Sequence, residues 1–351
     1  MTYIRVRTAG DRADHGGGLP DTTDGLAIAF HIKQSHLPPV TSLYFAAQTD
    51  MRHDRDFDPN YGIAVEILPG VRRLTAKNSG PFTFFGTNTY LLGTSRLAVV
   101  DPGPADEAHV ETILKAASGA SVEAIVVSHT HVDHSPAARL LKEKTGAPII
   151  GCGIHKAARE LMENEINPLD ASGDREYAPD RQLHEGDVLS AAGMSLQTIE
   201  TPGHTANHLC FALAEENLLL SADHVMGWST SIVAPPDGSM RDYMDSIDKL
   251  LNREEQIYLP GHGGVIHDAL SYVGDLKQHR LNREASVLRE LAETPLTIPQ
   301  IVVRLYADVD PALHRAAGLS VFAHLEDLAG RGLVSASPAL SLTATFTLRT
   351  S

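Results

Sequence analysis

The chain has 351 residues, enough for one large and one small domain with a sizeable buried core, and its 42% apolar and 21% charged residues are ordinary for a globular protein. The formal net charge of -15 argues against broad electrostatic attraction to nucleic acid or to an anionic membrane, and two cysteines, Cys152 and Cys210, are too few for a secreted disulfide scaffold. No apolar run approaches the roughly 18 residues of a membrane helix and the N-terminus lacks the apolar segment of a secretory signal, so we expect a cytoplasmic protein without membrane contact.

The first part of the chain divides at about residue 60. Residues 1–60 carry scattered charge and no sustained hydrophobic period, which predicts a partly disordered extension with one short strand near residues 41–47. Beyond it, strands are expected at 62–69, 87–92, 97–100, 124–128, 147–151 and 257–260 and repeatedly between 188 and 222, and helices at 105–117, 137–144 and 241–252. Strands mixed with surface helices predict a layered α/β sandwich over residues 61–267.

The segment from residue 268 to residue 351 has a different pattern. A long linker helix is expected over 268–293, then a short helix capped by Thr297 and a further helix over 311–331. Two alternating stretches, 333–337 and 340–348, predict a β-hairpin. Three helices followed by a hairpin is the order of a winged-helix domain.

The strongest chemical signal follows the apolar run at residues 124–127. Four ligand-type side chains occur within six residues: His129, His131, Asp133 and His134. Imidazole and carboxylate groups suit zinc, and also iron or manganese. The alternative is an ordinary solvated polar loop. The composition of this segment and its position directly after a buried strand favour a metal site.

Three later positions supply single side chains of the same type. His204 follows a Pro-Gly turn, Asp223 follows an apolar run, and His262 lies at the end of a predicted strand and before two glycines. Each of the three is weak evidence by itself. Because all of them lie at strand ends, they can converge on one edge of the sandwich together with the earlier cluster.

This series of motifs resembles the metallo-β-lactamase superfamily, in which HxHxDH is followed by His, Asp and His. The resemblance implies an αββα sandwich that holds two metal ions. Carried over to this sequence, the ligands of the first metal are His129, His131 and His204. Those of the second are Asp133, His134 and His262, and Asp223 bridges the two. We expect two Zn²⁺ ions, with iron or manganese left open.

The implied chemistry is hydrolysis by a metal-activated hydroxide. Two metal ions about 3.5–4 Å apart generate hydroxide near neutral pH and polarise the substrate's carbonyl or phosphoryl oxygen. Asp133 and Asp223 are expected to orient this nucleophile. The presence of both aspartates argues against a true β-lactamase and fits the nucleases and thioester hydrolases of this fold.

Further segments narrow the resemblance to the β-lactamase-like protein 2 subgroup. They are residues 85–93, the Val-Asp-Pro-Gly turn at 100–103 and residues 201–208, together with the C-terminal winged helix. The animal member is an endoribonuclease specific for single strands, so the resemblance implies hydrolysis of phosphodiesters. Within 201–208, His208 has either a catalytic role or only a hydrogen bond near the site. Trp228 either lines the substrate cleft or packs as a core side chain.

The leading hypothesis is therefore a phosphodiesterase or endoribonuclease acting on single-stranded RNA, and the alternative is a thioester hydrolase, as in glyoxalase II or an acyl-CoA thioesterase. The RNA hypothesis needs a cationic groove, for which Lys277, Arg280 and Arg283 are the candidates. A DNA-binding regulator is the alternative from a different functional class. Residues 284–351 carry seven acidic against five basic side chains, so we expect no binding of duplex DNA. The winged helix should instead shape one wall of the metal cleft or support a homodimer.

Overall fold

The computed structural model describes residues 51–162 and 165–349, so the strand expected near residues 41–47 lies outside the described residues. Residues 51–60 have no regular secondary structure, but they contact the rest of the chain. Met51 packs against an apolar cluster, the backbone N–H of Asp54 donates to Gly227, and Arg73 donates to the carbonyl of Asp58. This part of the expected extension therefore lies along the sandwich.

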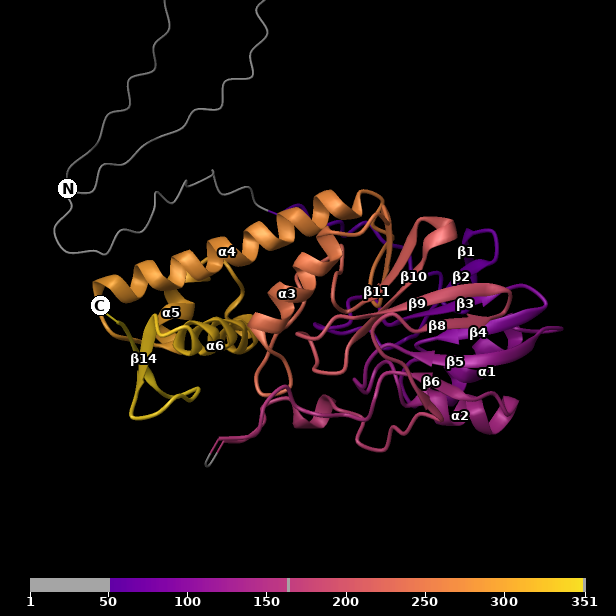
Figure 1. The fold of residues 1–351 in the computed structure, drawn as a ribbon, viewed down its shortest axis with the longest axis horizontal. Helices are drawn as coiled ribbons and strands as arrows, with labels where there is room; N and C mark the ends of the chain where they lie inside the picture. Colours follow the sequence, from indigo (N-terminus) through magenta and orange to yellow (C-terminus); the bar gives the residue numbers. More distant parts are fainter. Residues whose placement is uncertain (1–50, 163–164, 350–351) are drawn as a thin grey trace, which may run out of the picture. The chain divides into compact units, whose positions relative to one another are not determined.

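Two β-sheets lie at the centre of the described chain (Figure 1). The first has the strand order β1-β2-β3-β4-β5-β6-β7, antiparallel up to β4 and parallel from there. Its strands are β1 (Val65–Leu68), β2 (Val71–Thr75), β3 (Asn88–Gly93), β4 (Arg96–Val100), β5 (Ser121–Val127), β6 (Ile149–Gly151) and β7 (Arg181–Gln182). The second has the order β12-β11-β10-β9-β8. Its strands are β8 (Val188–Ala191), β9 (Met194–Glu200), β10 (Leu209–Leu213), β11 (Leu218–Ala222) and β12 (Ile257–Pro260).

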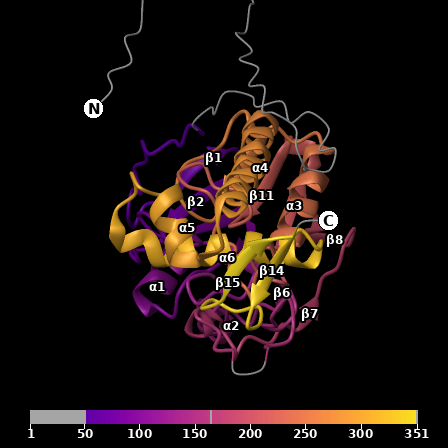
Figure 2. The same ribbon diagram turned by 90° about the vertical axis from the view of Figure 1, so that its left-hand side faces the viewer.

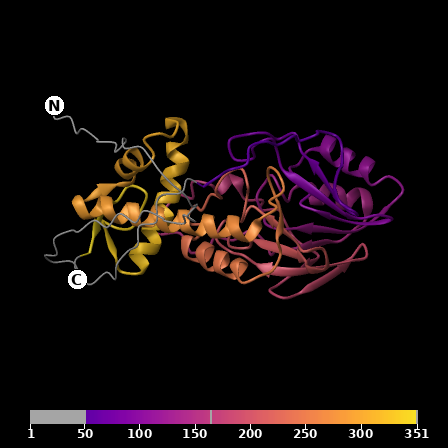
Figure 3. The same cartoon turned by 90° about the horizontal axis from the view of Figure 1, so that it is seen from above.

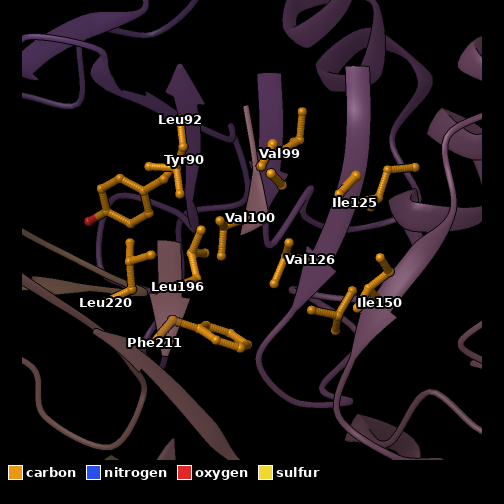
Figure 4. Packing of buried hydrophobic residues seen from close by; sticks show 14 of the residues in the cluster. Tyr90, Leu92, Val99, Val100, Ile125, Val126, Ile150, Leu196, Phe211 and Leu220 are labelled. Atoms are coloured by element: carbon orange, nitrogen blue, oxygen red, sulfur yellow. The ribbon is translucent and has the colours of Figure 1, made fainter. Parts of the chain in front are cut away.

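Alternating side chains of the second sheet build two separate apolar layers. Leu209, Phe211 and Leu213 of β10 face the first sheet, whereas Cys210 and Ala212 pack on the opposite side. Figure 4 shows Phe211 and residues of β9 and β11 pointing toward side chains of the first sheet. Because both faces are covered, β10 is buried along its whole length and reads as a continuous apolar run.

Helices cover both outer faces, which completes the predicted α/β sandwich. Figure 3 separates the layers by colour, with residues 65–150 in indigo to magenta and the second sheet in salmon. On the first sheet lie α1 (Glu107–Ala116) and α2 (Ala137–Thr145), and on the second α3 (Met240–Leu251) and the start of α4 (Ala269–Glu293). Side-chain caps start two of them, since Asp106 accepts from the N–H of Ala108 and Ser239 from that of Asp242. Short 3-10 turns lie at η1 (Asp170–Ser172) and η2 (Ala214–Glu216).

The C-terminal module, residues 294–349, follows α4 and has its own core around Phe322 and Phe346 (Figures 1 and 2). Its elements are β13 (Leu296–Thr297), α5 (Ile298–Leu305), η3 (Pro311–Leu313), α6 (His314–Gly330), β14 (Val334–Ser337) and β15 (Thr345–Leu348). The strands form a sheet of order β13-β15-β14. Thr297 and Gln300 form a capping box at the start of α5, as the sequence predicted for Thr297.

Helix α6 packs beside α3, and this contact joins the C-terminal module to the sandwich. Ala323 enters the apolar layer beneath α3 and α4. At the same helix, Glu326 pairs with Arg159, and Asp327 accepts from Nε of Arg241 at 3.0 Å. Both acidic side chains of this helix therefore serve contacts within the chain. Among the helices of residues 51–162 and 165–349, none is long and apolar enough to cross a membrane.

Candidate metal centre

Four segments of the chain meet at one edge of the two sheets. Each enters the site directly after a strand: the histidine-rich turn after β5, and single residues after β9, β11 and β12. The structure brings all seven predicted ligands together there. They are His129, His131, Asp133, His134, His204, Asp223 and His262. The strands beneath are rigid and buried, so the ligand positions are fixed by the sheet edge.

The first cluster, called here the His129 group, consists of His129, His131 and His204. Nδ1 of His131 lies 3.1 Å from Nε2 of His129 and 3.0 Å from Nε2 of His204. Three nitrogens bound to one tetrahedral zinc at about 2.05 Å would lie about 3.3 Å apart. The spacing of the three nitrogens therefore fits a single metal ion.

Hydrogen bonds on the far side of two rings decide which nitrogen can bind metal. Nδ1 of His204 donates to the carbonyl of Ile232 at 2.7 Å, which leaves Nε2 without a proton. The hydroxyl of Ser128 donates to Asp101, so Nδ1 of His129 donates to that hydroxyl at 2.9 Å and its Nε2 is again bare. Bare nitrogens that converge repel one another unless a cation lies between them, so this arrangement fits a metal site.

The second cluster, the His134 group, consists of Asp133, His134 and His262. Nε2 of His262 lies 3.4 Å from Nε2 of His134 and 3.2 Å from Oδ2 of Asp133. Nδ1 of His134 donates to Asp101 at 3.0 Å, and Nδ1 of His262 donates to the carbonyl of Gly86 at 3.1 Å. Both rings thus present Nε2 to the same point as the carboxylate.

Asp223 lies between the two groups, where a bridging ligand would be needed. Its Oδ2 is 3.6 Å from Nε2 of His204 and 3.4 Å from Nε2 of His262. Its Oδ1 is buried and has no hydrogen-bond partner within residues 51–162 and 165–349. A Cβ atom at Gly261 would lie 2.3 Å from this oxygen, so only glycine leaves room beside it. This oxygen also lies 3.4 Å from Nε2 of His134, and a buried carboxylate oxygen without a hydrogen bond is a further sign of a cation site.

The two groups differ in their affinity for protons. Burial, together with neighbouring imidazoles, lowers the pKa of His129 well below its ordinary value and that of His131 to about 3. Burial alone would also lower the pKa of His134 and His262, but the carboxylates of Asp133 and Asp223 outweigh it. They raise the pKa of His134 well above its ordinary value and that of His262 to about 9. At neutral pH the His129 group is therefore ready for a metal, whereas a metal in the His134 group must displace protons.

Two supporting residues had no assigned role in the sequence analysis. Asp101 is 3% exposed and accepts from Ser128 N–H, Ser128 Oγ and His134 Nδ1. Thr87 donates through Oγ1 to Oδ2 of Asp133 at 3.1 Å and is held in turn by Asn78. The Val-Asp-Pro-Gly turn marks Asp101 in the sequence, but the sequence does not show its contacts with Ser128 and His134, which are distant along the chain.

His208 lies beside the metal ligands, with both ring nitrogens in contact with other groups. Nδ1 lies 2.8 Å from Oγ1 of Thr201, and Nε2 accepts from the backbone N–H of Asp223 at 3.2 Å. The side chain is 1% exposed. Of the two roles left open for His208, this geometry favours fixing the position of Asp223.

Aromatic side chains flank the His134 group. Trp228 stacks on Phe84 with 4.8 Å between ring centroids and an interplanar angle of 8°, and it also covers Gly263, next to the ligand His262. Phe85 contacts Phe84 edge to face. On the same loop, Phe82 is 53% exposed. The three residues joined by ring contacts, Phe84, Phe85 and Trp228, are called here the aromatic wall.

The three cations expected to line a nucleic-acid groove have other partners. Lys277 pairs with Asp248, and Arg283 donates to the carbonyl of Leu305 and lies over the Tyr306 ring. Arg280 is 3% exposed and donates to the carbonyl of Ser231. The expected groove is therefore not formed by these residues. Cys152 and Cys210 are buried and free, as expected for core side chains.

Two family models match the chain, and their descriptions agree with this architecture. The metallo-beta-lactamase superfamily model matches residues 82–262, and the beta-lactamase associated winged helix domain matches residues 297–339. A beta-lactamase domain protein from Burkholderia ambifaria superposes with a TM-score of 0.70 at 21% identity, covering 84% of this chain and 96% of that one. The predicted fold, an α/β sandwich of this superfamily with a C-terminal winged helix, is confirmed.

Two curated relatives cover most of the chain. A beta-lactamase-like protein 2 homolog from Caenorhabditis elegans is 31% identical over 77% of this chain and 87% of its own length. An atrochrysone carboxyl ACP thioesterase from Passalora fulva is 28% identical over 77% of this chain and 78% of its own length. The resemblance to the β-lactamase-like protein 2 subgroup is thereby confirmed, and the second relative is named for a thioesterase activity.

Proposed function

The chain belongs to the metallo-β-lactamase superfamily, and on this premise we propose that it is a hydrolase with two metal ions that cleaves thioesters. The observation that carries the proposal is the convergence of the His129 group and the His134 group on two neighbouring points, with Asp223 between them. We assign the first metal to the His129 group, the second to the His134 group and the bridging position to Asp223. Zinc suits this set of nitrogen and carboxylate donors, and iron and manganese are alternatives that metal analysis distinguishes.

When bound, such metal ions supply acidified water and Lewis acidity toward the substrate's carbonyl or phosphoryl oxygen. The chain's own contribution is orientation and proton transfer. Thr87 holds Oδ2 of Asp133, so that the carboxylate faces the centre of the site and can accept a proton from attacking water. His208 holds the backbone of Asp223 in place, and Asp101 fixes the ring of His134.

Two observations favour a thioester as the substrate. The aromatic wall offers apolar surface for an acyl or aryl group directly beside the His134 group. The cations that a polyanionic strand would need, Lys277, Arg280 and Arg283, are engaged elsewhere in the fold. The relative from Passalora fulva, which is named as a thioesterase, is in keeping with this choice.

Single-stranded RNA is the second candidate, and one observation supports it. Exposed aromatic side chains such as Phe82 and Phe85 can stack on unpaired bases, which is a common mode of binding single strands. For duplex DNA we propose no binding, because α6, the helix that would enter the major groove, packs on α3 and uses its acidic side chains for ion pairs within the chain.

One experiment separates these alternatives. The full chain is assayed for turnover of acyl-CoA and aryl thioesters and of end-labelled single-stranded RNA, with and without a chelator. The Asp133→Asn variant is the control for contaminating activity. We expect chelator-sensitive thioester hydrolysis that Asp133→Asn abolishes. Chelator-sensitive cleavage of RNA without thioester turnover would reverse the order of the two candidates.

A further inference from the structure

Residues 230–232 form a short segment that contacts two metal ligands at once. The hydroxyl of Ser231 donates to the backbone carbonyls of Asp223 at 2.5 Å and of His224 at 2.9 Å. The carbonyl of Ile232 accepts from Nδ1 of His204 at 2.7 Å, which keeps Nε2 of that ring free for metal. The position of this segment therefore sets the positions of two ligands, His204 of the His129 group and the bridging Asp223.

A single buried arginine holds the segment from the other side. Arg280 on α4 donates to the backbone carbonyl of Ser231 at 2.5 Å, and its guanidinium carbon lies 5.1 Å from the centre of the Tyr243 ring. Tyr243 donates to the carbonyl of His224 at 2.9 Å and packs against Gly203, next to His204. Arg280 thus contacts Ser231 and Tyr243, the two residues that hold the loops carrying His204 and Asp223.

Burying a guanidinium is costly, so its place in the fold calls for a function that a smaller apolar residue would not serve. Helix α4 extends from the second sheet to the C-terminal module, as Figure 1 shows. Two ion pairs of α6, Arg159 with Glu326 and Arg241 with Asp327, join that module to the sandwich. The module also holds α4 itself, since Val287 and Leu291 of α4 lie in its core and Arg331 pairs with Glu284, and it thereby anchors the helix on which Arg280 lies.

We infer that Arg280 is a positioning residue that fixes the metal ligands His204 and Asp223 through Ser231, and that the C-terminal module contributes to metal binding by anchoring α4. This inference rests on the proposed metal centre. It gives the winged helix a role in building the site, without any contact between the module and the substrate.

The test compares Arg280→Met and Arg280→Lys with a matched control, Arg283→Met. Arg283 lies one turn further along α4 and also stacks on a tyrosine, but its partners, Leu305 and Tyr306, belong to the C-terminal module. Three quantities are measured on the full chain: zinc affinity by competition with a chromophoric chelator, the visible spectrum of the cobalt-substituted protein, and the thermal midpoint of the metal-free protein.

We expect Arg280→Met to weaken zinc binding about 10–100-fold, as for other residues that orient metal ligands, and to change the cobalt spectrum. Arg280→Lys should restore part of the affinity because it retains a donor for the Ser231 carbonyl. Arg283→Met removes one contact between α4 and the C-terminal module, so it should lower the thermal midpoint and weaken zinc binding much less than Arg280→Met, with the wild-type cobalt spectrum. If Arg280→Met does not fold, Ser231→Ala provides the second test, because it removes the hydroxyl bonds to Asp223 and His224 and retains the buried arginine.

Wild-type zinc affinity and cobalt spectrum in Arg280→Met, or in Ser231→Ala where that variant is the one measured, would overturn the inference. An equal loss of affinity in Arg283→Met would overturn it as well, because the effect would then be one of general stability. Failure of the wild-type chain to bind zinc at the seven ligands is a separate outcome, which would refute the proposed function itself.

Discussion

Replacing Asp101 by asparagine tests how the site selects the metal-binding nitrogen of His134. The carboxylate accepts three hydrogen bonds, from Ser128 N–H at 2.8 Å, Ser128 Oγ at 2.6 Å and His134 Nδ1 at 3.0 Å. An asparagine side chain has one acceptor oxygen and one NH₂ donor, so it cannot accept all the hydrogen bonds that Ser128 and His134 donate. If the NH₂ group faces His134, Nδ1 becomes an acceptor and the ring proton moves to Nε2, the atom that should bind metal.

The expected magnitude follows from those bonds. A hydrogen bond to a charged group contributes about 1.5–3 kcal/mol, and a buried donor left without a partner costs about 1–3 kcal/mol. We therefore expect Asp101→Asn to lower the free energy of unfolding of the metal-free protein by about 2–4 kcal/mol. Affinity for the metal in the His134 group should fall about 10–100-fold. The His129 group should be weakened less, because Asp101 reaches it only through the Ser128 hydroxyl.

Chelator competition with the full chain measures the two affinities, and urea unfolding measures the stability. Asp174→Asn is the matched control, because Asp174 is a buried carboxylate of similar kind that binds Ser135 and Arg139 and no predicted ligand. The control should lose stability and keep both metals. Two metals bound with unchanged affinity in Asp101→Asn would refute the reasoning about the ring nitrogen.

Three further predictions concern the ligands and the substrate side. Asp223→Ala should reduce the metal content from about two per chain toward one or none, since a bridging carboxylate holds both ions; an unchanged stoichiometry by elemental analysis would mean that it only supports a ligand. Because burial opposed by Asp223 and Asp133 leaves the pKa of His262 at about 9, a metal entering the His134 group displaces a proton. The binding constant of this metal should fall about tenfold per pH unit for each displaced proton as the pH drops from 9 to 6. Calorimetry in buffers of different ionisation enthalpy measures the protons released, and a result of none would refute this prediction. Phe85→Ala should raise KM about three- to tenfold at nearly constant kcat, because the side chain is exposed and offers only contact area. An unchanged KM would show that the aromatic wall does not contribute to substrate binding.

The convergence of the seven candidate ligands could be predicted from the sequence, because each of the four segments that carry them follows a strand that is easy to recognise. The order of the elements was predictable for the same reason, and the strand expected at 257–260 coincides with β12. Strand β2 was missed, since its two arginines break the apolar pattern. In the structure Arg73 is 6% exposed, with its head group on the carbonyl of Asp58, so its stem packs like an apolar side chain.

The residues that support the ligands could not be predicted in this way. Asp101 and His134 meet because β4 and β5 pair in parallel, a register that the local sequence does not reveal. Arg280 illustrates the opposite case: the sequence makes it a candidate for a cationic groove, but the packing of α4 against α3 leaves it buried. Local patterns identify ligand types, whereas the contacts that orient them depend on tertiary structure.

The central claim is that hydrolysis by this chain requires two metal ions held by these seven residues. Metal-free full-length protein, titrated with zinc while thioester hydrolysis is followed, tests it most directly. The account predicts that activity rises with added zinc, reaches its plateau at about two ions per chain and disappears with chelator. A plateau at one ion per chain, or hydrolysis at full rate in the metal-free protein, would contradict it.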